Sequence, residues 1–277
     1  MSPVTDQPIH PTTHPEVNAV LQQFVEGASA ILGDQLVGFY LFGSLVRGDF
    51  DEMSDIDTVV ATEGEISKKS FTALSKMHAD IIAVGTYWAT NLEVSYIQKK
   101  ALRRYDSDNA THPRLERGKD EKLYYMHHHN DWVIERYELL ENGLALIGPP
   151  PETLIDPVSP DDLRRAMLGL IHSWIVTLPD NMPDSRGGQS YVVLTLCRLL
   201  YTLEQGGTAS KPDAVAWALE ALDASWHALI NSAWEGRQHP GEEPLSEDME
   251  QTIALINYTI EFSKQYEFSK QYETLPE

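Results

Sequence analysis

Residues 43–57, GSLVRGDFDEMSDID, connect two apolar runs, LVGFYLF at 36–42 and IDTVVAT at 56–62. Both runs are short and rich in aromatic or β-branched residues, so they predict two buried strands. Side chains alternate between the two faces of a strand. Asp55 and Asp57 stand two residues apart and are therefore expected to point the same way.

A third carboxylate can reach this pair from another predicted strand. NLEVSYI at 91–97 alternates, and Glu93 lies on its more polar face. If this strand runs beside the second one, three carboxylates converge, and they repel one another unless a cation lies among them. Mg²⁺ prefers a few carboxylates together with substrate phosphates.

The connection between the strands begins with a turn suited to phosphate. Gly43 lets the backbone approach a ligand closely, and Ser44 adds a hydroxyl to the backbone N–H groups. A lone D-x-D is more typical of an acidic surface turn. The whole pattern between two apolar strands instead favours nucleotidyl transfer, in which metal ions neutralise a triphosphate and a hydroxyl attacks in line.

The rest of the chain divides into a mixed half and a helical half. We expect an N-terminal α/β (α+β) domain with a mixed sheet over residues 1–147 and an all-α helical bundle over 148–277. Apolar spacing and end signals predict elements in both halves. These are helices over 17–32, 66–83 and 123–142, a loop or linker over 108–122, a helix capped by Ser159, a polar loop over 178–189 and an apolar helix ending at Gly206.

Composition limits the partners. The 277 residues carry a formal net charge of −21, which repels phosphate backbones, so we expect no nucleic-acid partner. Such a charge would attract a cationic ligand, although solubility alone is the more common reason for it. No apolar run reaches the ~20 residues of a membrane span, and no basic, apolar leader opens the chain. A single cysteine, Cys197, cannot form an internal disulfide. We therefore expect a cytoplasmic protein with no membrane partner.

Two motifs carry a family resemblance, over about residues 20–240. GSLVRGDFDEMSDID resembles the G-S-x-x-x-G…S-D-x-D signature of the DNA polymerase β-like nucleotidyltransferase superfamily. QSYVVLTLCRLLYTLEQGGTASKPDAVAWALEAL resembles the C-terminal domain of aminoglycoside adenylyltransferases, closest to the streptomycin and spectinomycin 3''/9 group. NLEVSYI is similar to the strand that carries the catalytic glutamate of that group.

The resemblance implies roles at matching positions. It implies ATP as co-substrate and two Mg²⁺ ions, with Asp55, Asp57 and Glu93 as metal ligands and Glu93 as the base. The residues implied to bind ATP are Gly43, Ser44, Ser54, Arg198 and Lys211. Those implied to bind the drug are Trp174, Asp180 and Asp184. The loop after Trp174 is longer than in the family, and residues 114–118 lack a tryptophan of the 3''/9 group.

The sequence therefore predicts Mg²⁺-dependent transfer of AMP from ATP to a hydroxyl of streptomycin or spectinomycin, by a protein that we expect to be a monomer. Two alternatives stay open. One is the same chemistry on another small-molecule or protein hydroxyl. The other is a non-catalytic nucleotidyltransferase-like binding module, against which the presence of Glu93 argues.

Overall fold

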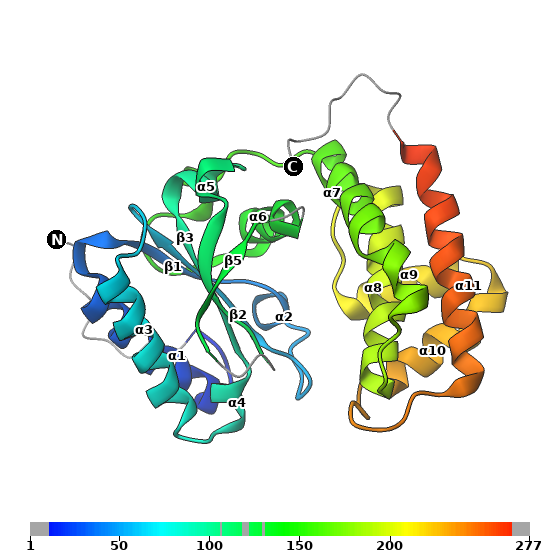
Figure 1. The fold of residues 1–277 in the computed structure, drawn as a ribbon, viewed down its shortest axis with the longest axis horizontal. Coiled ribbons are helices and arrows are strands. Elements are labelled where there is room, and N and C mark those ends of the chain that lie inside the picture. The colour runs from blue at the N-terminus through cyan, green and yellow to red at the C-terminus, as the bar shows by residue number, and fades with distance from the viewer. Residues whose placement is uncertain (1–10, 106, 118–121, 129–130, 268–277) are drawn as a thin grey trace. The chain divides into compact units, whose positions relative to one another are not determined.

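A computed structural model of the protein describes residues 11–105, 107–117, 122–128 and 131–267 (Figure 1). The chain forms two compact units, Met1–Pro157 and Val158–Glu277, and each is described by itself. The first contains a mixed sheet with helices and the second is helical, which confirms the predicted fold class. Within the described ranges, no helix combines the length and apolarity that crossing a bilayer requires.

The first unit contains a six-stranded sheet in the order β5-β4-β3-β2-β1-β6. The strands are β1 Leu36–Leu41, β2 Ile56–Thr62, β3 Leu92–Gln98, β4 Thr111–Leu115, β5 Tyr124–His127 and β6 Leu144–Ile147. β2 and β3 are parallel, whereas all other neighbouring strands are antiparallel. The predictions of strands over 36–42, 56–62 and 91–97 are confirmed to within one residue at each end.

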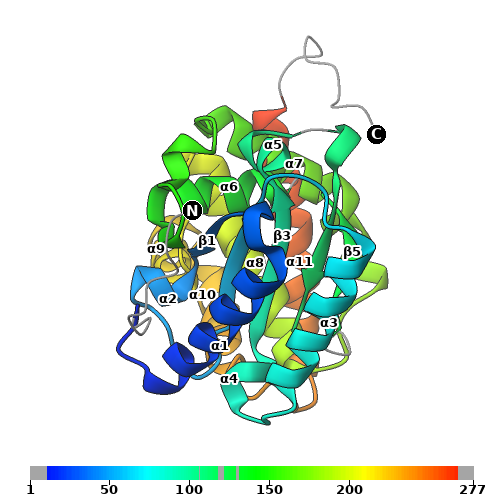
Figure 2. The same cartoon turned by 90° about the vertical axis from the view of Figure 1, so that its left-hand side faces the viewer.

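Helices cover both faces of this sheet. α1 and α3 lie side by side over one face (Figure 2), where Phe24 of α1 packs against Phe39 of β1. α5 and α6 supply apolar residues to a second cluster on the other face, which includes Trp132. The helices are α1 Pro15–Leu32, α2 Ser44–Arg47, α3 Lys68–Ile82, α4 Tyr87–Thr90, α5 Lys99–Arg103 and α6 Asp131–Asn142.

Two sequence predictions in this unit are wrong. The segment 108–122, predicted to be a loop or linker, contains β4, and the first part of the predicted helix 123–142 forms β5. The two strands pair antiparallel, with Thr111 opposite His127 and Arg114 opposite Tyr124. Residues 118–121 and 129–130 of these segments lie outside the described ranges.

Over residues 158–267, the second unit contains five α-helices whose ends agree with their local sequence. They are α7 Pro160–Ser173, α8 Arg186–Gln205, α9 Lys211–Ala221, α10 His227–Gly236 and α11 Ser246–Ser263. Ser159 and Asp162 form the capping box of α7, and Gly206 ends α8 with φ of 72°. The loop predicted over 178–189 is partly helical, because a 3₁₀ helix spans Ile175–Asp180 and α8 begins at Arg186.

Candidate active site

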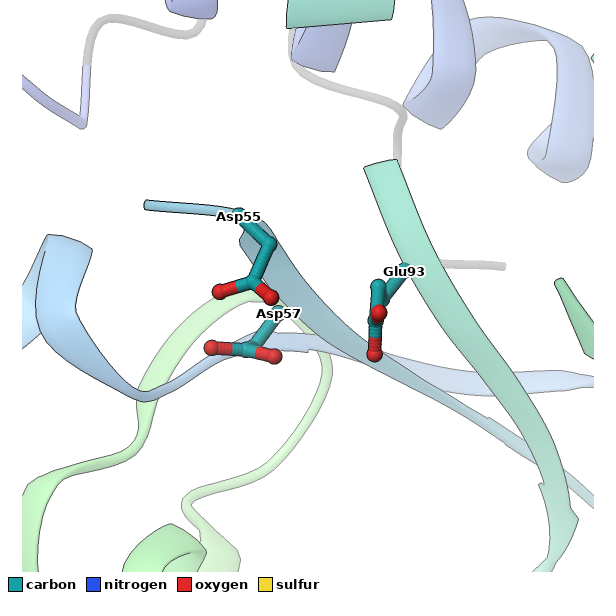
Figure 3. A group of neighbouring side chains, drawn as sticks. All are labelled: Asp55, Asp57 and Glu93. Atoms are coloured by element: carbon teal, nitrogen blue, oxygen red, sulfur yellow. The ribbon is translucent and has the colours of Figure 1, made fainter. Parts of the chain in front are cut away.

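Three carboxylates converge where β2 and β3 begin (Figure 3). Asp55 precedes β2, Asp57 is its second residue, and Glu93 is the second residue of β3. Because the two strands are parallel, Asp57 and Glu93 occupy paired positions. One oxygen from each of the three carboxylates lies within 4.8 Å of the others. The structure thus brings together the three residues that the sequence selects as metal ligands.

Hydrogen bonds around the strand ends hold this register. The Ile56 N–H donates to the carbonyl of Asn91 at 2.9 Å, and the Thr58 hydroxyl donates to the carbonyl of Glu93 at 2.8 Å. These bonds tie β2 to β3 on either side of Asp57. The two carboxylates therefore stand on a rigid ladder, which suits a site that must hold a precise geometry.

Burial and, second to it, the negative charge of Asp55 raise the pKa of Glu93 to about 7. Arg114 opposes this rise, whereas Glu116 and Glu135 add to it. A carboxylate whose charge is disfavoured by burial and by like charges is stabilised by a cation placed among the same oxygens. Oxygen ligands of this charge and number fit a hard divalent ion such as Mg²⁺.

The turn after β1 brings the backbone against this acidic group. Gly43 has φ of 72°, and a Cβ atom added to it would lie 2.2 Å from Oδ2 of Asp57. The Phe42 N–H donates to the carbonyl of Asp57 at 3.2 Å. The hydroxyl of Ser44 is buried and has no hydrogen-bond partner among the described residues. A glycine is therefore required at position 43, and the Ser44 hydroxyl is available to a ligand.

Ser54 has a different environment from Ser44. Its hydroxyl donates to Oδ1 of Asp51 at 3.1 Å and accepts from the Asp51 N–H at 3.0 Å. The residue is almost fully buried. These contacts close the turn that leads into Asp55, so the structure shows Ser54 shaping the loop.

Arg114 on β4 is a site residue that the sequence reasoning missed. It donates from Nη2 to Oε2 of Glu93 at 3.2 Å and lies between Glu93 and two further acids, Glu116 and Glu135. Its register partner is Ser95, two residues beyond Glu93 on β3. The only sequence signal was the alternation of His112, Arg114 and Glu116, which requires recognising β4 as a strand.

Helix α6 contacts the site through two glutamates one turn apart. Glu135 pairs with Arg114 at 3.3 Å, and Glu138 pairs with Arg47 of α2. The second pair is bidentate, with Nε and Nη2 of Arg47 donating to the Glu138 carboxylate at 3.0 and 2.7 Å. α6 thus braces both the phosphate turn and the strand beside Glu93.

The other predicted site residues lie in the second unit. Arg198 of α8 donates from Nε to the carbonyl of Ala209 at 3.0 Å, and Lys211 is the first residue of α9. Arg198 therefore contacts the turn that leads into Lys211. This brings two basic residues from different helices to the start of α9.

The predicted drug-binding residues lie at the junction of α7 and α8. Trp174 is the C-cap of α7, Asp180 ends the following 3₁₀ helix, and Asp184 directly precedes Ser185, the N-cap of α8. The ring of Trp174 lies 6.1 Å from that of Tyr191 on α8, whose residue surface is 56% exposed. Tyr191 is an aromatic neighbour that the sequence reasoning did not single out.

Comparisons with known proteins agree with both units. Residues 21–109 match the family described as a nucleotidyltransferase domain, and residues 153–261 match the C-terminal domain of aminoglycoside adenylyltransferase. An aminoglycoside (3'') (9) adenylyltransferase of Escherichia coli is 27% identical over 261 residues, covering 88% of this chain and 93% of the relative. A spectinomycin 9-adenylyltransferase of Staphylococcus aureus is 25% identical over 238 residues, covering 82% and 88%.

A solved structure has a similar fold. It is spectinomycin adenyltransferase AAD(9) from Enterococcus faecialis, crystallised with ATP and spectinomycin, and the TM-score is 0.69 at 20% identity, covering 89% of this chain and 98% of that one. The match to the nucleotidyltransferase domain lies in the first structural unit, and the match to the C-terminal domain lies almost wholly in the second. The chain therefore combines a nucleotidyltransferase domain with a C-terminal domain of the aminoglycoside adenylyltransferase family.

Proposed function

We propose that the protein transfers AMP from ATP to a hydroxyl of an aminocyclitol or aminoglycoside antibiotic, streptomycin or spectinomycin, in a Mg²⁺-dependent reaction. The observation that carries the proposal is the convergence of Asp55, Asp57 and Glu93 in a nucleotidyltransferase domain that precedes an aminoglycoside adenylyltransferase C-terminal domain. The named activities of the similar proteins support the acceptor class.

The three carboxylates would hold two Mg²⁺ ions. Bound Mg²⁺ supplies charge neutralisation on the triphosphate, which lowers the cost of attack at the α-phosphorus. The Ser44 hydroxyl and the N–H groups of its turn bind phosphate oxygens. Arg198 and Lys211 add positive charge for binding ATP.

Glu93 accepts the proton of the acceptor hydroxyl. The freed oxygen attacks the α-phosphorus, the bond to the β-phosphate breaks, and pyrophosphate leaves. Trp174 packs on the antibiotic, and Asp180 and Asp184 pair with its cationic groups. Because the reaction consumes ATP, we place the enzyme in the cytoplasm, where we propose that it acts as a monomer.

Pyrophosphate release tests this function. Purified protein with ATP and Mg²⁺ is assayed with streptomycin, spectinomycin, kanamycin or no acceptor, with Glu93→Gln as the matched variant without the base. Release that requires streptomycin or spectinomycin, and falls to a small residual rate in Glu93→Gln, supports the proposal. Release only with other hydroxyl compounds would retain the chemistry and replace the acceptor. Release unaffected by Glu93→Gln would show that Glu93 is not the base.

A further inference from the structure

Arg114 makes more contacts with acids than a simple ion pair needs. Its guanidinium donates to Oε2 of Glu93 at 3.2 Å, to the Ser95 hydroxyl at 2.9 Å and to Oε1 of Glu135 at 3.3 Å. Its Nε lies 3.7 Å from Oε1 of Glu116. These partners come from β3, from α6 and from the residue that follows β4.

Placing one arginine among three carboxylates removes charged groups from water, which costs desolvation free energy. The arrangement must therefore serve another purpose, such as fixing the orientation of a side chain. The side chains of Arg114 and Glu93 are only 13% and 18% exposed, so both groups are largely removed from water. A buried pair contributes little net stability relative to apolar packing. The planar guanidinium, however, holds its donors in a fixed fork, which fixes the orientation of a carboxylate that accepts from it.

The orientation of the Glu93 carboxylate keeps it close to the two aspartates. One edge of its carboxylate is held by Arg114, and a Glu93 oxygen lies within 4.8 Å of oxygens of Asp55 and Asp57. A glutamate has three side-chain torsions, so an unanchored carboxylate would sample positions away from the two aspartates. Arg114 is itself anchored through Nη1, which donates both to Ser95 of β3 and to Glu135 of α6.

We propose that Arg114 is a positioning residue that holds the Glu93 carboxylate in its reactive orientation, with Glu135 and Glu116 holding Arg114 in turn. This inference rests on the proposed function, because the orientation matters only if Glu93 acts as the base. It assigns to β4 a role in the reaction, although Arg114 itself exchanges no proton with the substrate.

Kinetics of four variants test the proposal: Arg114→Gln, Arg114→Lys, Glu93→Gln and the double variant. Loss of positioning should lower kcat by roughly 100-fold in Arg114→Gln while the KM for ATP changes little. Arg114→Lys, which keeps a charge without the fork, should recover part of this loss. The matched control is Arg103→Gln, which removes a more exposed ion pair with Asp156 in the same unit and should keep wild-type kcat.

The double variant separates positioning from general destabilisation. If Arg114 acts through Glu93, then adding Arg114→Gln to Glu93→Gln should lower kcat by no more than about 3-fold, because the shared effect is already lost. A second loss of roughly 100-fold in the Glu93→Gln background would overturn the proposal, as would wild-type kcat in Arg114→Gln. If circular dichroism shows that Arg114→Gln does not fold, Arg114→Lys carries the comparison.

A crystal structure of Arg114→Gln gives a readout that needs no acceptor. We expect the Glu93 carboxylate to rotate away from Asp55 and Asp57, and an unmoved Glu93 would overturn the inference. This result is independent of whether the wild-type protein modifies streptomycin or spectinomycin. Failure of the proposed function and failure of this inference are therefore distinguishable.

Discussion

At the scale of single residues, Gly43 shows how closely backbone and site chemistry are joined. Its φ of 72° is one that residues with a Cβ rarely adopt, and the space for a Cβ is taken by Oδ2 of Asp57. Any side chain at this position must therefore displace a proposed metal ligand. Gly48, in the same connection, has φ of 89° but no atom within 4 Å of an added Cβ.

These two glycines give a matched prediction. Gly48→Ala should lower the free energy of unfolding by about 1–2 kcal/mol, because it forces alanine into the left-handed conformation. Gly43→Ala should lower it by more, because its positive φ is combined with a collision between the new Cβ and Asp57. Only Gly43→Ala should also lower kcat, by roughly 100-fold, since only it displaces Asp57. Steady-state kinetics and denaturant unfolding on both variants check this. Equal losses of kcat in the two variants would show that displacement of Asp57 by the Cβ of Gly43→Ala is not the cause of the lost activity.

The ionised form of Glu93 that the proposed function needs is expected to destabilise the folded protein. Its carboxyl has a higher pKa in the folded protein, about 7, than the usual 4.5, so the folded state binds the proton more tightly than the unfolded state. This stabilising contribution is present at low pH and is lost as pH rises through about 4.5 to 7. In EDTA, Glu93→Gln should therefore melt above the wild type at pH 8 and gain much less at pH 5. Equal differences at both pH values would contradict this reading.

At the scale of elements, the sequence predicted the three carboxylates of the metal site but not β4, the strand that places Arg114 beside Glu93. The apolar run at 56–62 and the alternation at 91–97 were enough to predict the two strands that carry Asp57 and Glu93. The structure supplies the parallel pairing on which their convergence depended. β4 was not predicted as a strand, because Pro113 lacks an N–H and the segment around it is polar, as in a loop. The contact of Arg114 with Glu93 depends on a register set by distant residues, which no local pattern encodes.

Helix α6 allows a test of its bracing role. The bidentate pair between Arg47 and Glu138 is largely buried, with side-chain exposures of 18% and 8%. Glu138→Ala leaves the Arg47 guanidinium without this partner and should lower the free energy of unfolding by about 3 kcal/mol. Glu141→Ala, at an exposed position on the same helix, should change it by less than about 0.5 kcal/mol. Urea unfolding of both variants measures the difference. Similar free energies of unfolding would show that the pair between Glu138 and Arg47 does not stabilise the contact of α6 with α2.

At the scale of the whole molecule, two opposite effects act when the pH falls. The net charge of −21 decreases in magnitude, which relieves self-repulsion. Buried histidines act against this gain. Burial lowers the pKa of His78 to about 3, and burial together with the nearby positive charges of His128 and Arg114 lowers that of His112 to about 2. The unfolded chain therefore takes up protons below about pH 6.5 that the folded chain does not.

The sign of the histidine effect gives the last prediction. Because the unfolded state binds more protons between about pH 6 and 3, each buried histidine makes the free energy of unfolding fall by up to about 1.4 kcal/mol per pH unit on acidification. His112→Gln should flatten this slope by about that amount, since it removes one such group. Using the Glu93→Gln background removes the opposing contribution of Glu93, and comparing variants of nearly equal net charge cancels the change in self-repulsion. Urea unfolding from pH 4 to 7 gives both slopes, and equal slopes would mean that His112 is already protonated in the folded protein.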